Sequence, residues 1–210
     1  METNYIKVNK DAYNKLAKEY DEREYIIKDE FYKSVLFGDL GFEKGKTLLE
    51  IGPGRGARLK NFCEFGLDVT AIELSEEMSK LSMQRAPKAK IINKNVFECD
   101  FEDKFDYIYM EAVIHNFPLE DAKKLLKLVY KWLKDDGIFI CTTTVDESDY
   151  EGYQEKQDYE SKTKRFRHHY TKETFENLFK EEKFNIVNKI YKEEKDETRK
   201  KLWQVLYLGK

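Results

Sequence analysis

The sequence predicts an α/β fold built on a doubly wound sheet of seven strands, mostly parallel and with an antiparallel strand at the C-terminal end. Three observations support this fold class. From about residue 46, short apolar segments alternate with amphipathic ones, which is the pattern of strands separated by helices. A glycine-rich stretch, "GPGRG" at 52–56, follows the first of these strands. The chain closes with two strand-like segments joined by a charged turn, which indicates antiparallel pairing.

Strands are expected where short runs of β-branched, aromatic or other apolar residues lie between polar segments. Seven segments meet this description: 47–51, 68–72, 89–92, 105–109, 137–143, 184–192 and 201–210. Helices are expected between or beside them, at 57–65, 75–84, 119–133 and 171–180. Strands that are connected through helices lie parallel, with right-handed crossovers.

Two regions stand outside this alternation. Residues 9–20 and about 24–38 have the apolar spacing of helices, so residues 1–40 are expected to form a helical cover. Residues 145–170 are polar and rich in tyrosine, and are expected to form a lid-like insertion after the fifth strand. Neither a repeat nor a low-complexity linker interrupts the pattern, so residues 1–210 are expected to form a single domain.

Composition narrows the classes of function. Charged residues make up 38% of the chain, but their signs are interleaved and the formal net charge is −3, which argues against a nucleic-acid partner. No segment has the length of a membrane span and the N-terminus lacks a signal-peptide core, so a cytoplasmic protein is expected. The three cysteines are far apart and lack metal-ligand spacing, which predicts reduced thiols and no metal site.

The glycine-rich stretch predicts a ligand that approaches the backbone closely. In an open parallel sheet, ligands bind at the carboxyl ends of the strands, where this stretch lies. Glu73 ends the next strand, about twenty residues beyond the first glycine, and is placed to accept hydrogen bonds from ribose hydroxyls. Because Gly52, Gly54 and Ala57 satisfy the short G-x-G-x-x-G/A pattern, an NAD-dependent oxidoreductase is one interpretation.

Two features favour a different ligand. Glu50 precedes the glycines, where its charge would oppose a pyrophosphate and attract an amine or sulfonium. Gly56 adds a third position without a side chain at the start of the following helix, which suits a bulky group passing over it. S-adenosylmethionine has a ribose, an ammonium and a sulfonium, and carries no phosphate. It is therefore the expected cofactor, with S-adenosylhomocysteine as its product.

Three segments carry a family resemblance. "LLEIGPGRGARL", "VTAIELSEEM" and "FDYIYMEAVIHNFP" resemble, in order and spacing, motifs of the class I S-adenosylmethionine-dependent methyltransferases. "DAYNKLAKEYDE" is similar to the entry helix of the small-molecule branch of that family, of the methyltransferase type 11/25-like kind. The resemblance covers roughly residues 10–210 and implies a Rossmann-like, seven-stranded sheet.

The resemblance also implies roles for individual residues around the donor. Glu50 and the three glycines would hold its amino-acid end, Glu73 its ribose and Leu74 its adenine. The other implied donor contacts are Asn95 and Val96 at the adenine, Met110 and Glu111 beside the donor, and Tyr13 and Tyr20 over the sulfonium. The family commonly has an aspartate at the Asn95 position, so an amide would make that contact here.

Methyl transfer is an in-line displacement that needs a base only when the acceptor must lose a proton. His115 is the candidate base, and Glu111, four residues earlier, is expected on the same helical face to orient it or to bind a cationic acceptor. Both are therefore candidate catalytic residues. Because alignment alone can accelerate this reaction, a non-catalytic S-adenosylmethionine-binding module is also compatible with the sequence.

The acceptor is expected to be a small molecule bound between the helical cover and the insertion. The basic stretch "SKTKRFRHHYT" at 161–171 suits an RNA or an anionic acceptor, with Arg165, Arg167 and His169 as its candidate contacts. The candidate acceptor contacts as a whole are His115, Tyr153, Arg167 and His169. Oxygen, nitrogen, sulfur and carbon acceptors are all compatible with these residue types. Once the core faces are assigned, no apolar stripe is left over to indicate an oligomeric state.

Overall fold

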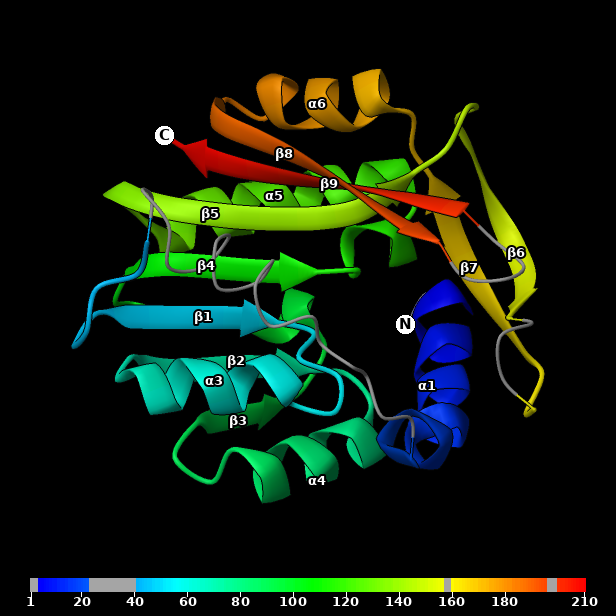
Figure 1. The fold of residues 1–210 in the computed structure, drawn as a ribbon, viewed down its shortest axis with the longest axis horizontal. Helices are drawn as coiled ribbons and strands as arrows, with labels where there is room; N and C mark the ends of the chain where they lie inside the picture. The colour runs from blue at the N-terminus through cyan, green and yellow to red at the C-terminus, as the bar shows by residue number, and fades with distance from the viewer. Residues whose placement is uncertain (1–3, 23–40, 157–159, 196–199) are drawn as a thin grey trace.

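The computed structural model describes residues 4–22, 41–156, 160–195 and 200–210. The predicted alternation of strands and helices is confirmed, and Figure 1 shows the resulting arrangement. The predicted helix at 9–20 forms a longer one, α1 (Asn4–Glu22), whereas the predicted helix at about 24–38 lies outside the described residues.

Seven strands form one sheet in the order β3-β2-β1-β4-β5-β9-β8. Their bounds are β1 Thr47–Ile51, β2 Asp68–Glu73, β3 Lys90–Asn93, β4 Phe105–Glu111, β5 Leu133–Val145, β8 Asn185–Lys195 and β9 Lys200–Gly209. The pairs from β3 to β5 are parallel, and β9 is antiparallel to both of its neighbours. The order reverses between β1 and β4, so a ligand site is expected at the carboxyl ends of these two strands.

The helices begin and end at residues that satisfy their backbone groups. The four helices that connect or follow the sheet strands are α3 (Ala57–Phe65), α4 (Glu76–Arg85), α5 (Leu119–Trp132) and α6 (Lys172–Glu181). The Ser75 hydroxyl accepts the Met78 N–H at the start of α4, and Thr171 and Thr174 form a reciprocal capping box at the start of α6. Two single turns, η1 (Val96–Glu98) and η2 (Ile114–Asn116), follow β3 and β4.

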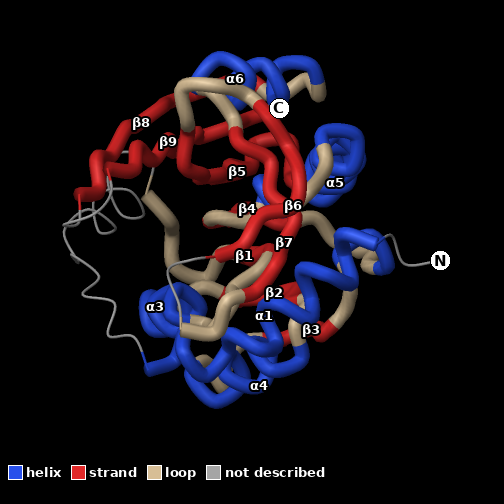
Figure 2. Tube along the Cα trace, turned by 90° about the vertical axis from the view of Figure 1, so that its right-hand side faces the viewer, coloured by secondary structure: helices blue, strands red, loops and turns tan. Residues whose placement is uncertain are grey.

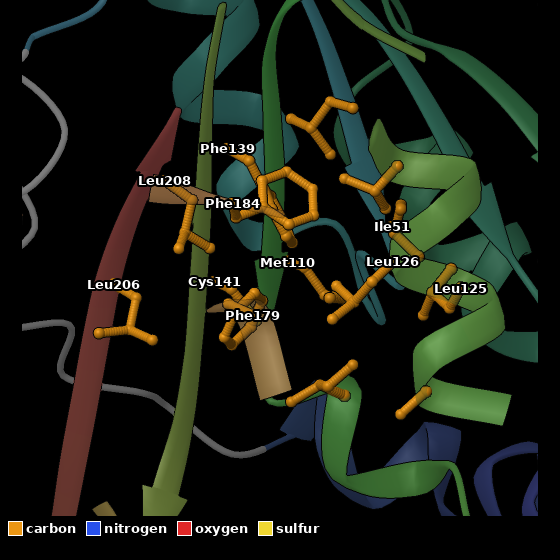
Figure 3. Packing of buried hydrophobic residues seen from close by; sticks show 14 of the residues in the cluster. Ile51, Met110, Leu125, Leu126, Phe139, Cys141, Phe179, Phe184, Leu206 and Leu208 are labelled. Carbon is orange, nitrogen blue, oxygen red and sulfur yellow. The ribbon is translucent and has the colours of Figure 1, made fainter. Parts of the chain in front are cut away.

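Two apolar layers hold the sheet. One contains side chains of β1, β4 and β5 with those of α5 and α6, including Met110, Leu125 and Phe179 (Figure 3). The other lies on the opposite face against α3 and includes Leu59, Phe62 and Tyr109. Figure 2 shows α3 and α5 on opposite sides of the strands. Alternation of side chains along each strand fills both layers at once.

The insertion is more regular than its polar sequence suggests. It forms a hairpin of β6 (Tyr150–Lys156) and β7 (Thr163–His169), a separate two-stranded sheet. Helix α1 packs against β7 on one side and α4 on the other, and it runs across the carboxyl ends of β1 and β4 (Figure 1). Among the described residues, no helix is long and apolar enough to cross a membrane.

Candidate functional site

The glycine loop between β1 and α3 forms the floor of the site. Gly52, Gly54 and Gly56 all have positive φ angles, of 69°, 58° and 79°, which L-residues with a side chain rarely adopt. A Cβ on Gly54 would meet no atom within 4 Å, so the backbone of this residue faces open space. The loop therefore offers a backbone surface to a ligand at Gly54.

The other two glycines serve packing. A Cβ on Gly56 would lie 2.8 Å from the Cα of Ser82 on α4, and a Cβ on Gly52 would lie 2.5 Å from the Cγ2 of Val113. The expectation that Gly56 opens space for a ligand is wrong, because α4 occupies that space. Gly56 instead allows α3 and α4 to approach each other.

Glu73, at the end of β2, fixes the loop. Its carboxylate accepts the Gly54 N–H at 2.9 Å and the Ser75 N–H at 2.8 Å. Only 7% of the residue is exposed, and this burial raises the pKa of Glu73 to about 7 in spite of the backbone hydrogen bonds that lower it. An acidic side chain thus lies beside the glycine backbone, as the strand spacing predicted.

Glu50, the next-to-last residue of β1, carries the most unusual carboxylate of the site. It is 3% exposed, and its Oε2 has no hydrogen-bond partner in the described part of the chain. Burial raises the pKa of Glu50 well above its usual range, Glu111 and Glu73 raise it further, and Arg58 opposes the shift. A buried carboxylate oxygen without a partner is costly, and the cost is relieved by protonation or by a hydrogen-bond donor or cation that binds to it.

Glu111 lies at the end of β4 and is held from two sides. Its carboxylate accepts hydrogen bonds from Arg58, with Nε at 2.9 Å and Nη2 at 3.4 Å, and from the Tyr109 hydroxyl at 2.9 Å. The predicted pairing of Glu111 with His115 on one helical face is wrong. No helix continues through this segment, because Ala112 adopts a φ of 57° and turns the chain directly after Glu111.

His115 instead pairs with β5. It lies in η2, is 3% exposed, and its Nδ1 is 2.8 Å from the Oγ1 of Thr143. Thr143 is fully buried and belongs to a run of three threonines at the end of β5. The ring of His115 is therefore held in place by a hydroxyl that comes from the neighbouring strand.

Helix α1 covers the site through polar contacts at its C-terminal end and near its middle. Arg55, in the glycine loop, donates to the Tyr20 and Asp21 carbonyls at the C-terminal end of α1. Tyr13 lies half-buried, 6.2 Å from the Tyr20 ring between centroids, and its hydroxyl donates to the Asn116 Oδ1 at 3.3 Å. The two predicted tyrosines thus lie together over the loop and η2.

The residues expected at the adenine, Leu74, Asn95 and Val96, divide into two groups together with Met110, which was expected beside the donor. Leu74 is half-buried and packs against a small cluster of Tyr5, Ile6 and Phe166, while Asn95 caps η1 by accepting the Phe97 N–H at 3.2 Å. Both lie at the carboxyl edge of the sheet. The side chains of Val96 and Met110 belong to the core layer against α5. A ligand at the edge of the sheet would therefore contact the backbone atoms of these two residues. Leu74, Asn95 and Val96 follow the ends of β2 and β3, and Met110 lies near the end of β4, but the direction of the Val96 and Met110 side chains was not predicted.

Strand β7 supplies the cationic groups of the site. Arg165 donates to the Tyr13 hydroxyl at 3.3 Å, and Arg167 donates to the Thr144 Oγ1. Since residues two apart share one face of a strand, both guanidinium groups lie on the same face of β7, where they reach Tyr13 of α1 and Thr144 of β5. Arg165 and Arg167 thus lie beside Tyr13 and Thr144, and their contact with an acceptor stays a prediction.

The other two predicted acceptor contacts lie elsewhere. Tyr153, on β6, is 42% exposed and packs edge-on against Phe166, with the Lys164 ammonium 5.2 Å from its ring centroid. His169 has both ring nitrogens engaged, Nδ1 by Asp146 at 2.7 Å and Nε2 by Gln154 at 2.9 Å. These contacts hold both side chains within the hairpin and its connection to β5.

Several residues of the site were not predicted from the sequence. Arg58, Thr143, Asn116 and Arg55 hold Glu111, His115, Tyr13 and the end of α1, respectively. The one local signal is "TTT" at 142–144, since three hydroxyls in succession are unusual at the end of a buried strand. The partners of Arg58 and Arg55 are long-range contacts without a sequence signature.

These features fit the amino-acid end of S-adenosylmethionine. An ammonium would satisfy the buried Oε2 of Glu50, and the open side of Gly54 leaves room for a ligand against the backbone. In the described ranges, no three His, Cys, Asp or Glu side chains are grouped so that they could hold a metal ion.

Comparisons with known proteins indicate the family of the chain. A family model described as "Methyltransferase domain" matches residues 20–189. Phosphoethanolamine N-methyltransferase 2 of Caenorhabditis elegans is 35% identical over 132 residues, which are 59% of this chain and 27% of that protein. An uncharacterised methyltransferase of Staphylococcus carnosus is 27% identical over 146 residues, or 66% of this chain and 69% of that protein.

A further relative shows the same partial coverage. Phosphoethanolamine N-methyltransferase of Plasmodium falciparum is 27% identical over 115 residues, 51% of this chain and 42% of that protein. The chain thus spans about a quarter to two thirds of the length of these relatives.

Solved structures share the fold. The 1,6-didemethyltoxoflavin-N1-methyltransferase of Burkholderia thailandensis superimposes with a TM-score of 0.75 at 18% identity, over 100% of this chain and 91% of that one. A S-adenosylmethionine-dependent methyltransferase of Methanosarcina mazei gives a TM-score of 0.69 at 20% identity, over 80% and 94% of the two chains. From the family match and the sheet order together, the chain belongs to the methyltransferase domain family and has its class I fold.

Proposed function

We propose that this chain transfers a methyl group from S-adenosylmethionine to a small-molecule acceptor. The observation that carries the proposal is Glu50, whose buried Oε2 has no hydrogen-bond partner in the described ranges. The family to which the chain belongs supports the same reading. Bound S-adenosylmethionine supplies an electrophilic methyl group on a sulfonium centre.

Around that donor, each residue of the chain has a distinct task. Glu50 accepts the ammonium, the Gly54 backbone forms the floor, and Glu73 faces the ribose while it holds the loop. Leu74 and Asn95 lie at the adenine end, and Tyr13 and Tyr20 cover the site from α1. The same Glu50 argues against a dinucleotide, because a pyrophosphate would bring negative charge beside a buried carboxylate.

The acceleration comes from alignment and exclusion of water. Helix α1 and the hairpin cover the carboxyl ends of β1, β4 and β5, so donor and acceptor would meet in a closed site. Oriented reactants reach effective molarities on the order of 10⁵ M or more. His115 and Glu111 are the candidate side chains nearest the acceptor, with Glu111 acting through its ion pair with Arg58.

The acceptor is proposed to carry an anionic group. Arg165 and Arg167 place two guanidinium groups on one face of β7, next to the Tyr13 and Thr144 hydroxyls. Guanidinium groups bind phosphate and carboxylate oxygens in bidentate fashion. Two relatives are named phosphoethanolamine N-methyltransferases, which makes a small phosphorylated amine the first acceptor to test.

The test of the donor is calorimetric titration with S-adenosylmethionine, S-adenosylhomocysteine and NAD in parallel. We expect S-adenosylmethionine and S-adenosylhomocysteine to bind with micromolar dissociation constants, which correspond to a binding free energy of about −8 kcal/mol. We expect no binding of NAD. Binding of NAD alone would contradict the methyltransferase proposal and favour the interpretation as an NAD-dependent oxidoreductase.

The test of the acceptor compares phosphoethanolamine with ethanolamine, which lacks the anionic group, by the rate of S-adenosylhomocysteine formation. Arg167→Met is expected to lower the rate with phosphoethanolamine about tenfold or more. Lys164→Met, on the opposite face of β7, is the matched control and is expected to leave the rate unchanged. Equal rates with the two acceptors would refute the anionic class, and donor binding without turnover of any acceptor would indicate a binding module.

A further inference from the structure

Thr143 and His115 form a buried polar pair at the end of the candidate site. Thr143 Oγ1 lies 2.8 Å from His115 Nδ1, and both residues are almost completely enclosed. A hydroxyl has one hydrogen to donate and can also accept, whereas the Nδ1 of a neutral imidazole either donates or accepts. The direction of this one hydrogen bond therefore decides which ring nitrogen of His115 carries the hydrogen.

The surroundings of Thr143 decide that direction. Over the residues that the structure describes, His115 Nδ1 is the one hydrogen-bond partner of Thr143 Oγ1. The neighbouring hydroxyl does not compete, because consecutive side chains of a strand point to opposite faces and Thr144 Oγ1 instead accepts from Arg167. If Nδ1 donated to Oγ1, the buried hydroxyl hydrogen would have no acceptor and would lose its interaction with water without replacement. When Thr143 donates to Nδ1, both the hydroxyl hydrogen of Thr143 and the lone pair of Nδ1 have a hydrogen-bond partner.

We propose that Thr143 is a positioning residue that fixes neutral His115 as the tautomer with its hydrogen on Nε2. His115 then donates a hydrogen bond from Nε2 to the methyl acceptor and does not act as a general base, because Nε2 has no lone pair to receive a proton. The statement about the acceptor rests on the proposed methyltransferase function. The statement about the tautomer rests on the Thr143 contact alone.

This assignment narrows the chemistry of the acceptor. The atom that faces Nε2 must accept a hydrogen bond, as an anionic or carbonyl oxygen does. The anionic group proposed to meet Arg165 and Arg167 has this property. An amine acceptor must lose a proton before its nitrogen can attack the methyl group. Because the protonated Nε2 cannot receive that proton, such an acceptor binds as the free amine after its proton has passed to solvent, and His115 contributes a hydrogen bond and no proton transfer.

The tautomer can be read directly by two-bond ¹⁵N–¹H NMR on protein labelled at histidine. The chain has three histidines, so His115→Gln assigns the His115 signals by their loss. At a pH where the ring is neutral, we expect Nε2 to show the signal of a protonated nitrogen and Nδ1 that of an unprotonated one. A hydrogen on Nδ1 in the unsubstituted protein would overturn the proposal.

Two variants test the role of Thr143. Thr143→Val keeps the shape of the side chain and removes the hydroxyl, so the two nitrogen signals are expected to move toward each other as both tautomers become populated. Thr143→Ser retains the hydroxyl and is expected to keep the original pattern. Unchanged signals in Thr143→Val would show that this hydroxyl does not select the tautomer. These readouts need neither donor nor acceptor, so they stand if methyl transfer itself fails.

Kinetics then test the role of His115. A glutamine amide can place an N–H near the position of Nε2 but cannot act as a base. We expect His115→Gln to retain activity within about tenfold of the original protein and His115→Leu to lose at least about tenfold more, as removal of a hydrogen bond to a charged group predicts. Equal loss in both variants would favour the general base and overturn the donor assignment. Affinity for S-adenosylhomocysteine is expected to stay the same in both.

Discussion

The carboxylate of Glu73 accepts a hydrogen bond from the backbone N–H of Gly54 at 2.9 Å, which ties the end of β2 to the glycine loop after β1. The same carboxylate accepts the Ser75 N–H, so one side chain holds both the loop and the start of α4. Its burial raises its pKa from 4.5 to about 7. The residue that is proposed to face the ribose is thus also a pH-sensitive part of the scaffold.

We predict that Glu73 makes the stability of the ligand-free protein fall as the pH rises from about 4.5 to about 7. In this window the unfolded chain has lost the proton that the folded protein retains, so the folded state binds more protons and the free energy of unfolding decreases with pH. The whole effect is on the order of 3 kcal/mol. It is complete once the pH has passed the folded-state pKa.

Urea unfolding at a series of pH values measures this slope. Glu73→Gln keeps the shape and one acceptor oxygen but has no charge to titrate. Between pH 4.5 and 7, the free energy of unfolding of this variant is therefore expected to fall by about 3 kcal/mol less than that of the unsubstituted protein. Glu50, whose pKa is also raised, contributes a slope of the same sign and is present in both proteins. An identical slope in the two proteins would contradict the prediction.

We predict that Glu50→Gln separates binding of the amino-acid end of the donor from binding of its nucleoside. The amide removes a buried charge, so the ligand-free protein is expected to become more stable, while the ammonium loses its carboxylate partner. Affinity for S-adenosylhomocysteine is expected to drop by about 1.5–3 kcal/mol, the contribution of a hydrogen bond to a charged group.

The matched ligand is methylthioadenosine, which has the same nucleoside and thioether but no amino-acid end. Its affinity is expected to be the same for Glu50→Gln and the unsubstituted protein, as calorimetry would show. If both ligands lost affinity equally, Glu50 would be supporting the loop and would not be binding the ammonium.

The fold was predictable because its signals are local. Each strand and helix has its own apolar period, and the position of Glu73 follows from the end of a strand alone. The β5 strand is the main exception, since it begins at Leu133 and not at 137. Its first residues, "LKDDG", have turn-forming composition, and the pairing of Leu133 with Phe105 precedes a break in register that no local pattern shows.

The partners inside the site were not predictable, for a different physical reason. His115 meets Thr143 across 28 positions, and Tyr13 meets Asn116 across 103, so these contacts depend on the packing of α1 and β5 and not on spacing along the chain. The expected Glu111–His115 pair assumed a continuous helix, which the left-handed turn at Ala112 prevents. Sequence position therefore identified which residues reach the edge of the sheet, but not which of them touch.

We predict that two neighbouring glycines respond differently to the same substitution. Gly54→Ala should still fold, with a free energy of unfolding lower by about 1–2 kcal/mol. This cost comes from the left-handed backbone alone, because a Cβ at this position meets nothing within 4 Å. Gly56→Ala should lose about 1–3 kcal/mol more, since its Cβ would lie 2.8 Å from the Ser82 backbone. Urea unfolding of the two variants measures the difference.

Ligand binding should depend on the side chain at Gly54, where the loop is open. Gly54→Val places a larger side chain in the open space above the loop and is expected to weaken S-adenosylhomocysteine binding by at least about tenfold, as an overpacked contact does. If Gly54→Val folds and binds normally, the donor does not pass over Gly54.

The last prediction concerns the ion pair of Arg58 and Glu111, whose side chains are 11% and 21% exposed. Arg58→Met should destabilise the protein by about 3 kcal/mol, because it leaves the Glu111 carboxylate enclosed without its cation. Adding Glu111→Gln removes that uncompensated charge, so the double variant should recover a large part of the loss. A double-mutant cycle from urea unfolding is expected to give a coupling energy of about 1–3 kcal/mol.

The exposed pair of Glu77 and Lys80 on α4, whose atoms lie 2.6 Å apart, is the control and should show no measurable coupling. Equal coupling in the two pairs would mean that enclosure at the end of β4 adds nothing to the Arg58 contact, and that Glu111 is held there mainly by the Tyr109 hydroxyl.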